Sequence, residues 1–327
     1  MITWHLPVFL YIILAYGLVR WFLKRYMLKN AREKKFFLQY VFCLPLAIAF
    51  AGARGELTLD RHTLNVFVVG FGVAFGTWFF WQAQNISQSR CSITSFLDDF
   101  VAMMGEYFFL GGGKYITPSI AAGIALSFGA VIPFGVRYYE KERKAASEKG
   151  VAELGLSEFV SAHGKINGLA AWLGKYFKFF LYVLGYSVSW GLSIFAARYF
   201  VLEKVPIGQF ILGWYSGTLA AASIIFLFYL SKSGKKVRES FVSGDVAKVF
   251  FLSLLIVLCM IVEYWALMLA PINVAYAIFM TAEMTIPAVI GIRFFREPKL
   301  DLEEKTLFGL GILGGILITL FFRRQGG

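Results

Sequence analysis

The stretch VFFLSLLIVLCMIVEYWALMLA occupies residues 249–270 and contains a single charged side chain, Glu263. A helix needs about 20 mostly apolar residues to cross a bilayer core of about 30 Å, so this stretch predicts a membrane-spanning helix. A carboxylate at membrane depth is costly unless it faces a cavity or a partner. The same stretch therefore indicates both the class of fold and a position where polar chemistry is to be sought.

Nine further stretches meet the same criterion, and they lie along the whole chain. They cover residues 4–23, 36–53, 63–84, 92–110, 116–136, 177–200, 207–230, 273–295 and 306–322. The composition agrees, since 58% of residues are hydrophobic and 16% are charged, against about 25% charged in soluble domains. These values exclude a soluble enzyme, a disordered chain and a disulfide-rich secreted domain. We predict an all-α membrane protein with ten transmembrane helices, the first of them an uncleaved span.

One long connector divides the ten predicted spans into five and five. Residues 137–176 include the charged run 140–144 and a patchily apolar part that could form a short interfacial helix. We interpret this connector as a basic linker between a first repeat, residues 1–136, and a second repeat, residues 177–327. A solvated tether is the preferred interpretation of the linker, and a binding element is the alternative.

The two halves share features in the same order. Tyr16-Gly17 in the first span matches Trp190-Gly191 in the sixth, and Asp98 in the fourth matches Glu283 in the ninth. Glycines six residues apart recur in the fifth and tenth spans, at 123 and 129 and at 309 and 315. Shared order at similar spacing indicates an internal repeat. Because each repeat has an odd number of helices, the second copy is expected to be inverted, as in many secondary transporters.

The net charge of +12 is distributed unevenly between the two sides of the predicted bundle. Of the 32 Lys and Arg residues, 24 lie in or beside connectors that follow odd-numbered spans. The positive-inside rule places that side in the cytoplasm and both termini outside. The basic loops fit anionic lipid headgroups, and no motif indicates nucleic-acid binding.

The second half resembles a known family most clearly. The segments that carry the resemblance are Tyr264-Trp265-Ala266-Leu267, Ala270-Pro271-Ile272-Asn273, Ile286-Pro287, Phe294-Phe295-Arg296-Glu297, Gly309 and Gly314-Gly315, together with Trp190-Gly191. On these residues the chain is similar to the drug/metabolite transporter superfamily, with two EamA-type five-helix domains. In the first half, Gly112 stands at the position of the family glutamate and Ala102 at that of the proline.

The resemblance implies ten helices, a central cavity between the halves and alternating-access transport of small metabolites. It also implies that both termini lie inside, which is opposite to the orientation predicted from charge.

Five acidic residues fall within the predicted spans, and two of them occupy equivalent positions. We predict that Asp98 and Glu283 bind a cationic group or exchange protons, with Glu106 and Glu263 as further candidates. The alternative is that these carboxylates are hydrogen-bonded and stabilise the bundle. Asp99 is more typical of a helix end. Arg20, the one cation within a span, is expected to pair with a carboxylate of the fourth or ninth span, or to extend toward the interface.

Aromatic and amide side chains give a second group of candidates. Trp81, Gln82 and Gln84 end the third span, and Trp265 lies in the eighth. They suit a cavity wall that stacks on a substrate and hydrogen-bonds it, or an aromatic belt at the membrane interface. The three histidines have no neighbours at the spacing of metal ligands, so we expect no metal and no cofactor.

We predict a secondary transporter that moves a small polar metabolite or drug across the membrane by alternating access, with proton coupling as one form of the mechanism. The expected partners are a small-molecule substrate and the lipid bilayer, and the expected location is the cell membrane, as a multi-pass protein of a prokaryotic plasma membrane. The alternative is an integral membrane enzyme, such as a prenyl or lipid-phosphate transferase. Such enzymes hold Mg²⁺ through acidic clusters, and Asp98-Asp99 is the one acidic doublet within the predicted spans.

Overall fold

The computed structural model describes residues 4–27, 32–86, 96–126, 129–130, 133, 181–233, 243–294 and 301–321 of the chain. Within these residues all regular secondary structure is helical, and no strand occurs. The all-α class predicted from the apolar stretches is therefore confirmed for the described part. The predicted linker, residues 137–176, lies outside the described residues.

The first span changes its winding along its length. The α-helix α1 (His5–Tyr11) continues into the π-helical stretch η1 (Ile12–Val19), then α2 (Arg20–Phe22), then a second π-helical stretch η2 (Leu23–Met27). A π-helix closes its hydrogen bonds over five residues, is rare, and occurs often at functional sites. The sequence gives no sign of this winding, because the residues of η1 and η2, Gly17 apart, also occur in ordinary α-helices.

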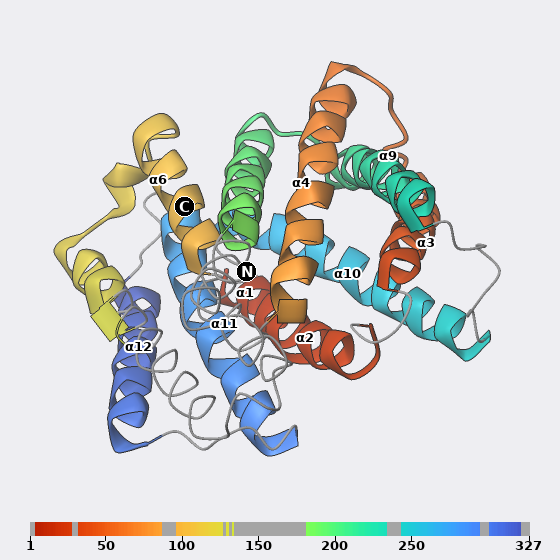
Figure 1. The fold of residues 1–327 in the computed structure, drawn as a ribbon. Helices are drawn as coiled ribbons and strands as arrows, with labels where there is room; N and C mark the ends of the chain where they lie inside the picture. The colour runs from red at the N-terminus through yellow and green to blue at the C-terminus, as the bar shows by residue number, and fades with distance from the viewer. Residues whose placement is uncertain are drawn as a thin grey trace, which may run out of the picture.

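The remaining helices follow the predicted segments closely. They are α3 (Arg32–Ala53), α4 (Arg61–Ile86), α6 (Phe96–Phe109), α9 (Ile207–Ser233), α10 (Ser243–Leu269), α11 (Ile272–Phe294) and α12 (Leu302–Phe321), shown in Figure 1. Two helices without a label cover residues 118–126 and 181–202, and the short 3-10 helix η3 (Gly112–Tyr115) precedes the former. Each of the ten predicted segments overlaps a helix.

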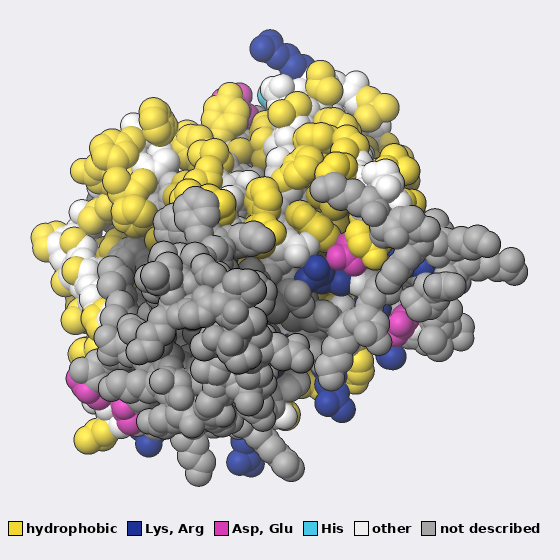
Figure 2. All heavy atoms as spheres, viewed as in Figure 1, with side chains coloured by type: hydrophobic (Ala, Val, Ile, Leu, Met, Phe, Trp, Pro, Cys, Tyr) yellow, Lys and Arg dark blue, Asp and Glu magenta, His cyan; other side chains and the backbone are white. Residues whose placement is uncertain are grey.

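Among the described residues, five helices are long and apolar enough to cross a membrane. They are His5–Met27, Arg32–Ala53, Arg61–Ala83, Ile207–Ser231 and Asp245–Leu269. Large apolar side chains on these helices point outward, including Leu64, Val68 and Phe228. Figure 2 shows such side chains over much of the described surface in that view. A soluble protein rarely exposes contiguous apolar surface on this scale, so these are the helices of a membrane protein.

The helix α6 covers the later part of the predicted span 92–110 and has 14 described residues. Residues 92–95 of that span lie outside the described part. Because α6 begins at Phe96, Asp98 and Asp99 lie in its first turn. The acidic doublet is therefore at the start of the described helix.

The closest helix contact in the described structure joins α4 and α9. A Cβ atom added at Gly70 would lie 2.2 Å from the Trp214 carbonyl oxygen, and one added at Gly217 would lie 2.0 Å from that of Phe67. Glycine is required at both positions, because the two backbones touch. Small residues allow such an approach between helices in membranes, where packing takes the place of the hydrophobic effect.

Other contacts complete a bundle in which α11 is central. The helix α11 packs on α6, α12 and η1, while α3 packs on both α9 and α10, and α10 also packs on α1 and η1. The unlabelled helix 118–126 touches α12 where Gly123 meets Ile318. The unlabelled helix 181–202 packs on α4 through Gly76 and Gly185 and on α6 through Gly191.

A hydrogen-bonded cap fixes the start of α4 and ties it to α9. Asp60 accepts the Thr63 backbone N–H at 3.0 Å, and the Gln209 side chain of α9 donates to the same carboxylate. These hydrogen bonds, that from Thr63 first, hold the pKa of Asp60 below its usual range. The loop between α3 and α4 is thereby fastened to the beginning of α9.

Candidate functional site

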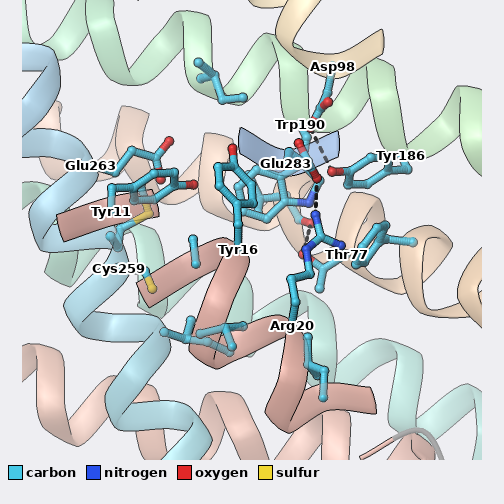
Figure 3. Close-up of a pocket in the computed structure, with 18 of the residues that line it drawn as sticks. Tyr11, Tyr16, Arg20, Thr77, Asp98, Tyr186, Trp190, Cys259, Glu263 and Glu283 are labelled. Atoms are coloured by element: carbon cyan, nitrogen blue, oxygen red, sulfur yellow. Dashed lines mark hydrogen bonds and ion pairs between the residues drawn. The ribbon is translucent and has the colours of Figure 1, made fainter. Parts of the chain in front are cut away.

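A cavity of about 160 Å³ lies inside the bundle, among residues from both halves of the chain. Figure 3 shows charged and aromatic side chains of several helices pointing into it. The aromatic lining residues are Tyr11, Tyr16, Tyr40, Phe80, Trp81, Tyr186, Trp190, Trp214, Tyr215 and Tyr276. The charged lining residues are Arg20, Asp98, Asp99, Glu263 and Glu283.

Three carboxylates meet at one end of this cavity. Asp98 and Asp99 project from the first turn of α6, and Glu283 projects from α11. One oxygen of each lies within 4.8 Å of one oxygen of the others, and all three residues are buried. The start of a helix carries a partial positive charge and stabilises carboxylates there. The first turn of α6 therefore helps to hold this acidic cluster, which is named the α6–α11 cluster below.

Arg20 provides the positive charge opposite the cluster. Its guanidinium pairs with the Glu283 carboxylate and lies 4.4 Å from the centre of the Phe80 ring. Of the two expectations for Arg20, the structure shows pairing with a carboxylate of the predicted ninth span and not extension toward the membrane interface. A cation between a carboxylate and an aromatic face is stabilised by both charge and the ring quadrupole.

A tyrosine stabilises the other side of the cluster. The Tyr186 hydroxyl donates a hydrogen bond of 2.8 Å to Asp98 Oδ2, and the Asp99 backbone N–H donates one of 3.0 Å to Asp98 Oδ1. Asp98 is therefore held in place by both its own helix and the neighbouring helix 181–202. This arrangement fixes the position of one carboxylate, while Asp99 Oδ2 has no such contact among the described residues.

A second carboxylate lies at the other end of the cavity. Glu263 of α10 accepts a hydrogen bond from the Tyr276 hydroxyl, and Tyr11 lies beside it (Figure 3). Tyr16 stands between this end and the α6–α11 cluster in the same view. The cavity therefore has two acidic ends separated by tyrosine rings.

The described lining has an excess of negative groups. It contains four carboxylates and one guanidinium, with no lysine and no second arginine among the described lining residues. Ionised groups are strongly destabilised away from water unless opposite charges or protons neutralise them. The cavity is thus built to hold positive charge, as protons or as a cation.

The sequence-predicted residues divide into two groups in the structure. Asp98, Glu283, Glu263 and Trp81 line the cavity. Gln82 does not line it, and its side chain accepts a 3.1 Å hydrogen bond from Arg32 at the start of α3. Trp265 is half-buried away from the lining. The side chain of Gln84, in the last turn of α4, lies outside the described part.

Glu106 joins helices away from the cavity. Its carboxylate accepts a 3.2 Å hydrogen bond from Arg198 Nε and a 2.8 Å hydrogen bond from the Asn273 backbone N–H. Arg198 also donates to the Leu267 carbonyl at the end of α10. Both side chains are buried. Glu106 therefore connects α6, helix 181–202 and the turn between α10 and α11, which is the arrangement expected from the structural alternative.

Several cavity residues were not among the predicted site residues. Tyr16 and Trp190 served only to align the repeats, although both line the cavity. Their equivalent positions were a usable signal, because equivalent residues of inverted repeats are expected to face the same central space. Tyr186 and Tyr11 gave no comparable signal, since tyrosine also occurs at membrane interfaces.

Comparison with known proteins gives a fold but no family. No family model and no curated protein matches this chain. A solved crystal structure of a protein is similar over 98% of both chains, with a TM-score of 0.67 and 14% sequence identity. At this identity the likeness extends to the fold alone.

Proposed function

We propose that this protein is a secondary transporter of the drug/metabolite transporter superfamily, which moves a small polar metabolite or drug across the cell membrane by alternating access. The observation that carries the proposal is the cavity within the bundle, which charged residues of both halves line together. Polar groups inside a helical membrane bundle mark the pathways of substrates or ions. No cofactor takes part in the proposed mechanism, and the lipid bilayer surrounds the bundle.

The pattern of helix contacts supports two inverted five-helix repeats. If the n-th span corresponds to the (n+5)-th, the contact of α4 with α9 corresponds to that of α10 with α3, and both occur. The contact of η1 with α10 corresponds to that of helix 181–202 with α4, which also occurs. The contacts of α6 with α11 and of α3 with α9 each join two equivalent spans, so exchanging the halves leaves them unchanged. This network supports ten spans arranged about a pseudo-two-fold axis.

Polar ties between the halves supply a closed side for such a mechanism. Glu106 binds Arg198, and Glu56 in the loop between α3 and α4 accepts the Gly208 backbone N–H at 2.6 Å. Gln209 donates to Asp60 near the same point. All three ties join the first half to the second half. Opening this side would require them to separate together while the other side closes.

The cavity carboxylates are the groups that would couple transport to an ion gradient. Asp98 and Glu283 are the proposed anchors of the substrate or the proton, and Glu263 is a third site. Binding of a positive charge to one conformation and its release in the other would shift the equilibrium between them. In the proton-coupled form, substrate flux produces a pH change inside vesicles.

The acidic cluster also gives the enzymatic alternative some support. Asp98, Asp99 and Glu283 have the proximity of a divalent-cation site, and Mg²⁺ bound by carboxylates is what a prenyl or lipid-phosphate transferase requires. Release of inorganic diphosphate from an isoprenyl diphosphate, dependent on Mg²⁺ and on purified protein, would favour this alternative.

The transport proposal is tested on purified protein in proteoliposomes. A thermal-shift screen over amino acids, amines and nucleotide sugars selects candidate substrates, and their uptake is then measured. Asp98→Asn and Glu283→Gln are expected to lower uptake about tenfold or more, which corresponds to about 1.4 kcal/mol of lost interaction. Glu203→Gln, at an exposed position away from the cavity, is the matched control and should transport normally. Uptake unchanged in both cavity variants would refute the anchor assignment.

A further inference from the structure

We infer that the cavity binds a small organic amine in its ammonium form, with Asp99 as the anchor of its charge. This inference rests on the proposed transport function, since it names the class of substrate that the same cavity takes. Four observations carry it: a buried acceptor without a donor, the charge of the lining, the nature of the walls and the volume.

The acceptor is Asp99 Oδ2. Asp99 is 2% exposed and lines the cavity, and no described residue donates a hydrogen bond to this oxygen. Nearly all buried polar atoms have partners, and a buried acceptor without one is costly. An ammonium group has three donors and no acceptor. Placed here, it would reach Asp99 and the neighbouring oxygens of the α6–α11 cluster.

The charge of the lining favours a cationic ligand over a neutral or anionic one. Four carboxylates face one guanidinium among the described lining residues. An anionic ligand would add to this excess, and a neutral ligand would leave it unchanged. A monovalent ammonium ion reduces it while preserving the pair of Arg20 and Glu283.

The walls favour an organic cation over a metal ion. Metal ions such as Ca²⁺ and Mg²⁺ need six or more oxygen ligands, whereas most of the described lining is aromatic or aliphatic. The position of Arg20 over Phe80 shows that this lining accommodates a nitrogen cation against a ring. Tyr16 and Trp190 offer further ring surface near the cluster.

The volume limits the ligand to a compact molecule. The cavity of about 160 Å³ is close in volume to an engineered protein cavity of about 150 Å³ that binds benzene. A monoamine with one ring or a short chain is of the appropriate size. A peptide or a nucleotide sugar exceeds it.

The experiment compares tyramine with 2-(4-hydroxyphenyl)ethanol, which carries a hydroxyl in place of the amine. Binding to the full-length protein in nanodiscs is measured by isothermal titration calorimetry, with butylamine and agmatine as further amines. We expect saturable binding of at least one amine and at least about tenfold weaker binding of the alcohol, since a charged hydrogen bond is lost. Asp99→Asn should lower the affinity for the amine by a similar factor, and Glu203→Gln should leave that affinity unchanged.

Four results would overturn the inference. They are equal binding of tyramine and its alcohol, unchanged amine affinity in Asp99→Asn, no binding of any of the three amines to folded protein, and tight Mn²⁺ binding that excludes the amines. The folded state of each variant is checked by its thermal transition. An amine that binds through Asp99 but never crosses proteoliposomes would refute the transport proposal alone. Transport of a neutral or anionic metabolite without amine binding would refute this inference alone.

Discussion

Arg20 illustrates how much of the site can be predicted at the scale of single residues. Its charge within an apolar span singles it out in the sequence, and Glu283 is singled out for the same reason. Their pairing joins residues 263 positions apart. It depends on how the first span crosses α11, and no local pattern encodes that crossing. The charged participants are therefore recognisable in the sequence, whereas the pairs that they form depend on the fold.

Glu106 and Asp98 also show that the sequence does not determine the surroundings of a buried carboxylate. In the sequence it resembles Asp98, since both are acidic residues in one apolar segment. The structure separates them, because Glu106 is used by Arg198 and the start of α11 while Asp98 faces the cavity. What distinguishes the two is the identity of their neighbours, which only the fold supplies.

The pair of Glu106 and Arg198 leads to a prediction about stability. Arg198→Met removes one partner and leaves the other charge buried, and breaking a buried pair in this way costs about 3–5 kcal/mol. Arg54→Met is the control, because Arg54 is 50% exposed in its pair with Glu56 and such pairs contribute at most about 1 kcal/mol. Denaturant unfolding in detergent micelles measures both. Equal losses of unfolding free energy in the two variants would show that the buried pair stabilises the protein no more than the exposed pair does.

At the scale of elements, the existence of the helices was predictable and their contacts were not. Apolar length alone located every predicted segment on a helix, because about 20 apolar residues have few other stable forms in a membrane. Residues 92–95 of the predicted fourth span lie outside the described residues, and the described α6 begins at Phe96. This start places Asp98 and Asp99 in the first turn of the helix.

The contact of α4 with α9 gives a prediction with an internal control. Gly217→Ala places a methyl group where the Phe67 carbonyl lies, so the two helices must separate, and overpacking of this kind costs about 1–3 kcal/mol or more. Gly72→Ala, on the partner helix α4, meets nothing within 4 Å and should be neutral or stabilising by up to about 1 kcal/mol. The thermal transitions of the two variants are compared in micelles. A Gly217→Ala protein as stable as Gly72→Ala would mean that the backbones are not in contact.

At the scale of the whole molecule, the charge distribution predicts the orientation in the membrane. Ala145→Cys places a thiol in the basic linker and Leu59→Cys places one in the loop between α3 and α4, where Leu59 is 88% exposed. The positive-inside rule puts the linker in the cytoplasm. In intact cells a membrane-impermeant maleimide is therefore expected to label residue 59 and not residue 145, in a background without the natural cysteines. The reverse pattern would support the orientation implied by the family resemblance.

The proposed internal repeat also belongs to this scale, and in the sequence it is an alignment only. Matching Asp98 with Glu283 predicted that both would lie near the centre, and both line the cavity. The alignment had no means of locating Tyr186 or the second acidic end at Glu263. These depend on side chains that differ between the two halves of the chain.

The winding of the first span has a mechanical consequence. Each hydrogen-bonded turn of the π-helical stretch η1 contains one residue more than a turn of an α-helix. If one such turn tightened to α, everything beyond it would advance by one residue, a rotation of about 100° and a translation of about 1.5 Å. Arg20 follows η1 directly, so this screw motion would swing its guanidinium away from Glu283 without unfolding any helix. The first span would then have two conformations, which differ by one residue in helical register.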